Sequence, residues 1–142
     1  MEVLKDTKIN HCRAVAEFLF NHTTLTDRRD EMYVLGLLHD IGYLYGPEGH
    51  NKSGGGLLKG LGYADWSSVY KHGNPNEYSS TMTDELNWAD MQIDHTGQLV
   101  GFTRRLESIK ERYGETSKQY YNSKRIVDDL LSKGYIDIGF GA

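Results

Sequence analysis

The segment from Val34 to Gly42, with the sequence VLGLLHDIG, restricts the possible folds of this chain more than any other segment. Its apolar side chains cover nearly the whole circumference of a helix: Val34, Leu35, Leu37, Leu38 and Ile41. A helix that is apolar on almost every side is buried, so a central helix is predicted from about Thr26 to Ile41. His39 and Asp40 then lie side by side at its C-terminal end.

Helical periodicity recurs along the rest of the chain, at 8–21, from 50 or 53 to 61, and at 66–71, 83–93, 100–113 and 117–132. In the first of these segments His11, Val15 and Leu19 share one apolar face, so the side chain of His11 is predicted to point inward. Thr83 is predicted to cap the helix that follows it. Strand-like alternation is limited to 135–138. The sequence therefore predicts an all-α fold, a compact single-domain helical bundle of about six to seven helices.

Length and charge exclude several classes of protein. A chain of 142 residues fits one domain with its own core. The net charge of −4 at pH 7 argues against a surface for nucleic acid or for an anionic membrane. Cys12 is the single cysteine, which excludes a disulfide framework and a cysteine metal site. No run is long enough to span a membrane and no signal-peptide core is visible, so the predicted location is cytoplasmic.

Polar residues at helix ends that face the apolar stripes form the candidate site: His11, His39, Asp40, His50, His72 and Asp90. Imidazoles combined with carboxylates suit Fe, Mn, Co, Ni or Zn better than Mg or Ca, which prefer oxygen ligands. Six protein ligands exceed what one ion takes while keeping positions for water, so two ions bridged by Asp40 are the economical arrangement. We expect one or two divalent transition-metal ions, with Fe or Mn favoured over Co, Ni or Zn.

This order of residues resembles the HD-domain superfamily of metal-dependent phosphohydrolases. The local sequences match as well as the order: HCRAVAEFL, LGLLHDIG, HNKSGGGLL, VYKHG and LNWAD. The two additional histidines, His50 and His72, are similar to those of the dinuclear branches, which include diadenosine tetraphosphate hydrolases and cyclic-dinucleotide phosphodiesterases. The resemblance implies two metal sites that share Asp40. One site also has His11, His39 and Asp90, and the other has His50 and His72.

The same resemblance implies one HD domain over residues 1–142, with a metal-site core at about 8–95 and helices at about 100–133 that complete the bundle. Two departures separate the chain from particular branches. Many dinuclear members carry a lysine three residues after the motif aspartate, where it can approach substrate phosphate, and here that residue is Tyr43. The Gly-Tyr-Pro extension of one cyclic-dinucleotide branch is also missing. The substrate of any one branch is therefore not implied.

Hydrolysis of a phosphoester or phosphoanhydride in a small phosphorylated molecule is the activity that the resemblance implies, with a nucleotide as the preferred substrate. Two divalent ions lower the pKa of a bridging water, and the resulting hydroxide attacks phosphorus. Asp40 is the predicted catalytic carboxylate. Asp94, one helical turn after Asp90, is a second candidate that orients water or protonates a leaving oxygen. Candidate phosphate-binding groups are Lys52, Lys71, Arg104 and Arg105.

Three other functions remain open from the sequence. The first is a single-metal 5′-nucleotidase-like enzyme, and the second is a regulatory HD module that binds metal and nucleotide without turnover. The third is a metal-free helical interaction domain. The expected partner is the small substrate alone, with neither nucleic acid nor membrane, and the oligomeric state is not indicated. Four aromatic residues near the motifs either stack on a base or belong to the core: Tyr43, Tyr45, Tyr63 and Trp66.

Overall fold

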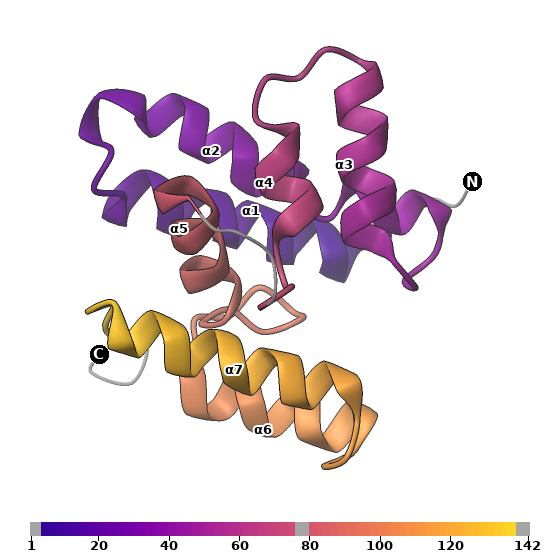
Figure 1. Cartoon of the computed structure of the whole chain (residues 1–142), viewed down its shortest axis with the longest axis vertical. Helices are drawn as coiled ribbons and strands as arrows, with labels where there is room; N and C mark the ends of the chain where they lie inside the picture. Colours follow the sequence, from indigo (N-terminus) through magenta and orange to yellow (C-terminus); the bar gives the residue numbers. More distant parts are fainter. Residues whose placement is uncertain (1–3, 76–79, 139–142) are drawn as a thin grey trace.

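The computed structural model describes residues 4–75 and 80–138, and its regular elements within them are helical (Figure 1). The helices are α1 (Asp6–His22), α2 (Arg29–Leu38), α3 (His50–Gly60), α4 (Trp66–Lys71), α5 (Thr81–Asp90), α6 (Gly101–Tyr113) and α7 (Lys118–Ser132). Two 3-10 segments, η1 (Thr26–Arg28) and η2 (Ile41–Tyr45), flank α2. The predicted all-α fold is confirmed, and the stretch at 135–138 is not a strand.

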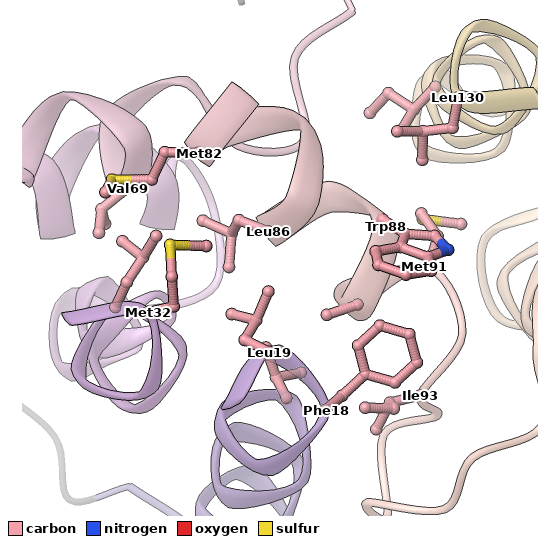
Figure 2. Close-up of a cluster of buried hydrophobic side chains, with 14 of the residues drawn as sticks. Phe18, Leu19, Met32, Val69, Met82, Leu86, Trp88, Met91, Ile93 and Leu130 are labelled. Atoms are coloured by element: carbon pink, nitrogen blue, oxygen red, sulfur yellow. The ribbon is translucent and has the colours of Figure 1, made fainter. Parts of the chain in front are cut away.

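The arrangement places α5 between two groups of helices (Figure 1). On one side α1 packs against α2, and α3 packs against α4. On the other side α6 and α7 lie side by side, and α7 contacts α5. Leu86 of α5 faces Leu19 of α1 and Met32 of α2 in the core, while Leu130 of α7 lies near Trp88 (Figure 2).

The predicted helix around residues 34–41 differs from the structure in two respects. It ends at Leu38, and the chain turns through His39 and Asp40 into η2. One face of α2 is also exposed, since Val34 is 42% and Leu37 is 40% accessible. The physical reason is that α2 packs chiefly on α1, with smaller contacts to α5, so its apolar residues exceed what these neighbours cover.

The predicted cap of α5 was wrong by three residues. Ser80 is the N-cap, and its hydroxyl accepts a hydrogen bond from the backbone N–H of Thr83. Thr83 is instead buried inside the first turn, where its hydroxyl donates to the Ser68 hydroxyl of α4. A serine three residues earlier satisfies the free N–H groups of the helix start just as well as a threonine would.

The contact between α1 and α2 depends on Gly36. A Cβ atom at this position would lie 2.6 Å from the Cα atom of Ala16 and 2.7 Å from its backbone nitrogen. Both of these atoms belong to the backbone of α1, so they move only if the helix moves. Gly36 therefore lets the two helices approach closely, and this approach brings the end of α2 beside His11 of α1.

We expect Gly36→Ala to lower the free energy of unfolding by about 1–3 kcal/mol, because the added methyl group forces α1 and α2 apart. Gly56→Ala is the matched control, since a Cβ atom there would meet no atom within 4 Å. On an exposed helical position alanine is favoured over glycine, so the control is expected to gain about 0.5–1 kcal/mol. Chemical denaturation of both variants measures the difference, and equal effects would contradict the close-contact role of Gly36.

Candidate metal centre

The six residues predicted as metal ligands converge from five parts of the chain. His11 lies in α1, His39 and Asp40 follow α2, His50 begins α3, His72 follows α4, and Asp90 ends α5. Their side-chain donor atoms form three overlapping groups, within each of which all atoms lie within 4.8 Å of one another. No single helix can surround an ion, so this convergence is the geometry that a metal site needs.

Asp40 is the centre of the cluster, and its two carboxylate oxygens face different pairs of histidines. Oδ2 lies 3.2 Å from Nε2 of His39 and 3.6 Å from Nε2 of His11. Oδ1 lies 3.3 Å from Nε2 of His50 and 3.4 Å from Nε2 of His72. A carboxylate with one oxygen toward each pair has the geometry expected for a bridge between two ions.

Asp90 belongs to the first of these pairs. Its Oδ1 atom lies 2.8 Å from Nε2 of His11 and 3.5 Å from Nε2 of His39. Arg105 of α6 contacts Asp90 at two points. Its Nε donates to the Asp90 carbonyl oxygen at 3.1 Å, and its Nη2 lies 3.8 Å from Oδ1. Asp90 therefore combines with His11, His39 and Oδ2 of Asp40 on one side of the cluster.

Each of the four histidines bonds through Nδ1 to a backbone carbonyl oxygen. For three of them the carbonyl lies three residues earlier: His39 to Gly36, His50 to Pro47 and His72 to Val69. The fourth, His11, bonds to the carbonyl of Asp94 at 2.8 Å. A carbonyl oxygen only accepts, so the ring proton is on Nδ1 and, in the neutral ring, the lone pair of Nε2 faces the cluster. Metal-ligating histidines are oriented in this way.

Two of these ring nitrogens lack the partner that a buried polar atom requires. Nε2 of His39 and Nε2 of His72 are buried and make no hydrogen bond within the part of the chain that the structure describes. Buried polar atoms are nearly always hydrogen-bonded, so such an atom needs a specific explanation. A metal ion bound by imidazole nitrogen and carboxylate oxygen supplies one, and the donor set fits a divalent transition metal.

The charges of the cluster favour the ligand forms of its carboxylates. Burial opposes ionisation of Asp40, but the charge on His39 outweighs it and holds the pKa of Asp40 well below its usual value. For Asp90 burial is likewise outweighed, by the hydrogen bond to His11 and the nearby His39 ring, and its pKa is well below the usual value. Burial lowers the pKa of His72, which keeps that ring neutral. Burial also opposes the charge on His39, yet the Asp40 carboxylate raises its pKa well above the usual value.

Glycines place His50 within reach of Asp40. A Cβ atom at Gly42 would lie 1.7 Å from the carbonyl oxygen of His50 and 2.7 Å from the backbone nitrogen of Gly54. At Gly55 it would lie 2.5 Å from Cβ of Tyr70 in α4. Gly54 and Gly55 of α3 thus allow close packing against Gly42 and Tyr70, and the helix begins at His50.

The remaining predicted site residues lie in different surroundings. Lys52 and Arg104 are exposed on α3 and α6, and Lys71 is half-buried at the end of α4. The Asp94 carboxylate accepts hydrogen bonds from Thr96 and Gln98 of its own loop. The main-chain carbonyl of Asp94 orients His11, as described above. The hydrogen bonds from Thr96 and Gln98 are all accepted by Oδ1, and the role of Asp94 in orienting water or protonating a leaving oxygen stays a prediction.

The aromatic residues near the motifs divide between site and core. The Tyr43 ring packs against the His50 ring, with centroids 4.3 Å apart. Tyr63 and Trp66 pack against the hydrophobic core, and Tyr45 is exposed. Tyr43 is thus the member of this group that borders the cluster.

Lys8 is a neighbour of the cluster that the sequence interpretation missed. Its Nζ atom lies 3.1 Å from Oδ2 of Asp40 and 3.9 Å from the centre of the Tyr43 ring. Lys8 precedes His11 by three residues in α1, and residues three apart on a helix share a face. Its spacing from His11 was the pattern that could have identified it.

Comparison with known proteins defines the class to which this fold and cluster belong. The sequence model of the HD domain matches residues 9–129, so the chain belongs to the HD domain family. This family implies the superfamily of metal-dependent phosphohydrolases, most of whose members are hydrolases that bind divalent metals. No curated protein and no solved structure matches the chain. Within the described residues, no helix has the length and apolar character needed to cross a membrane.

Proposed function

We propose that this chain is a dinuclear phosphohydrolase that cleaves a phosphoester or phosphoanhydride bond in a small phosphorylated molecule. The observation that carries the proposal is the division of the Asp40 oxygens between two histidine pairs. One ion would be held by His11, His39 and Asp90 together with Oδ2. The second would be held by His50 and His72 together with Oδ1.

The residues of the chain prepare this site in three ways. Asp40 and Asp90 are ionised and so bring negative charge to two cations. Backbone carbonyls hold the imidazoles with Nε2 toward the centre, which reduces the rearrangement needed on binding. His50 is the most accessible of the four histidines, so substrate would enter on its side. Bound divalent ions supply the acidity that deprotonates water near neutral pH and the charge that neutralises a phosphate group.

A nucleotide is the proposed substrate because the six-residue pattern resembles the dinuclear branches of the family. A single-metal, 5′-nucleotidase-like enzyme is the second candidate, and one observation favours it. His39, His72 and Asp90 also form a group whose donor atoms lie within 4.8 Å of one another. An ion placed among these three residues would draw ligands from both sides of the cluster, and two ions would then compete for them.

Metal content of anaerobically purified, untagged protein separates these candidates. We expect about two transition-metal ions per chain, and about one in His50→Ala and His72→Ala, because each variant removes a ligand of the second ion. Hydrolysis of nucleotides and phosphoesters should fall sharply in both variants. About one ion in the unsubstituted chain, with activity retained in both variants, would support the single-metal enzyme. Bound metal and nucleotide without phosphate release would identify a regulatory module.

A further inference from the structure

Lys8 places a positive charge at the edge of the metal cluster. Its side chain is 21% exposed, whereas that of Asp40 is 5% exposed. The Lys8 side chain is therefore partly open to solvent, although its ammonium group contacts a carboxylate that is almost fully buried. Its contact with the Tyr43 ring limits the directions in which it can move.

The ammonium group has donors left for a ligand. A lysine ammonium carries three N–H donors. Within the described residues one hydrogen bond is formed, to Oδ2 of Asp40. The remaining N–H donors of Lys8 lie beside the Asp40 carboxylate, which would hold both ions. A phosphate oxygen bound to those ions would therefore lie within reach of the Lys8 ammonium group.

We propose that Lys8 is a phosphate-binding residue of this site, which bonds to Asp40 and to a non-bridging phosphate oxygen of the substrate at the same time. This inference rests on the proposed function. Among residues 4–75 and 80–138, Arg105 is the other cation that contacts a carboxylate of the cluster, but it already donates to the backbone of Asp90 and is less exposed. Lys8 is therefore the cation best placed to meet an incoming anion. The ligand class is a phosphate group with at least one free anionic oxygen.

A purely structural role for Lys8 predicts a different result. If Lys8 only oriented Asp40, its loss would weaken metal binding first, and phosphate binding would fall as a consequence. If Lys8 binds phosphate, its loss weakens phosphate binding while metal affinity stays the same or rises, because a positive charge near the ions has been removed. The two roles are therefore separated by measuring metal and phosphate binding independently.

The experiment uses Mn²⁺ alone, and then orthophosphate added to the Mn²⁺-loaded protein, both followed by titration calorimetry. Lys8→Met and Lys8→Gln remove the charge, and Lys8→Arg keeps it. Lys5→Met is the matched control, since Lys5 lies three residues earlier and is exposed. We expect both neutral variants to bind orthophosphate about tenfold more weakly or worse, with Mn²⁺ affinity undiminished. Lys8→Arg and Lys5→Met should stay within about threefold of the unsubstituted protein.

Two results would overturn the inference and leave the proposed function intact. The first is unchanged orthophosphate affinity in the neutral variants, and the second is a loss of Mn²⁺ affinity as large as the loss of phosphate affinity. Absence of Mn²⁺ binding in the unsubstituted protein would instead overturn the proposed function and this inference with it.

Discussion

Asp40→Asn is expected to remove bound metal from both proposed positions and to lower hydrolysis by about a thousandfold or more. Asparagine keeps the shape of aspartate but is neutral and has one oxygen in place of two. Whichever way the amide is turned, one histidine pair then faces an NH₂ group, which cannot bind a cation. Elemental analysis and turnover measure the loss. Asp128→Asn is the matched control, since it also removes one negative charge but lies on the exposed surface of α7. It should retain both metal and activity.

Folding of the Asp40→Asn variant requires a separate measurement, because the Asp40 carboxylate is the main group that raises the pKa of the buried His39 ring. Loss of the carboxylate removes the interaction that raises the pKa of His39. The ring can then become neutral, which limits the loss of stability that an unpaired buried charge would cause. A variant that melts cooperatively and lacks metal would support the proposed role of Asp40. A folded variant that still holds two ions would show that Asp40 is not the bridge.

Gly42→Ala is expected to remove one ion of the two and to lower turnover by about a hundredfold, although it changes no proposed ligand. The new Cβ atom would lie 1.7 Å from the carbonyl oxygen of His50 and 2.7 Å from the nitrogen of Gly54. Both atoms belong to the backbone of α3, so the first turn of that helix must shift and carry His50 away from Asp40. The ion on the side of His11 and Asp90 uses residues from other helices and should remain.

Metal stoichiometry and turnover of Gly42→Ala are best compared with two other variants. His50→Ala removes the imidazole ligand itself and should give a similar result. Gly56→Ala adds the same methyl group to α3, the helix that Gly42 contacts, at a position where a Cβ atom would meet nothing within 4 Å. It should keep both ions. Gly42→Ala protein with two ions and normal turnover would contradict the role assigned to the contact between Gly42 and α3.

Local sequence pattern determined most of the helical structure. The helix expected at 66–71 is α4 as observed, and the helices expected at 100–113 and 117–132 each begin within one residue of the predicted start. Helical periodicity depends on residues a few positions apart, so it can be read without knowledge of the rest of the fold. The polar residues at the helix ends were found in the same way, and the family assignment followed from their order and local sequences.

Tertiary structure alone decided which faces are covered and which atoms meet. Val34 and Leu37 are as apolar as Leu35, but α1 covers only one side of α2, so those two remain exposed. The carboxylate of Asp94 bonds to its own loop, which spacing from Asp90 did not indicate. Lys8 reaches Asp40 from a position 32 residues away in the chain. Such contacts depend on how closely two helices approach and at what angle, and periodicity within one helix contains no information about either.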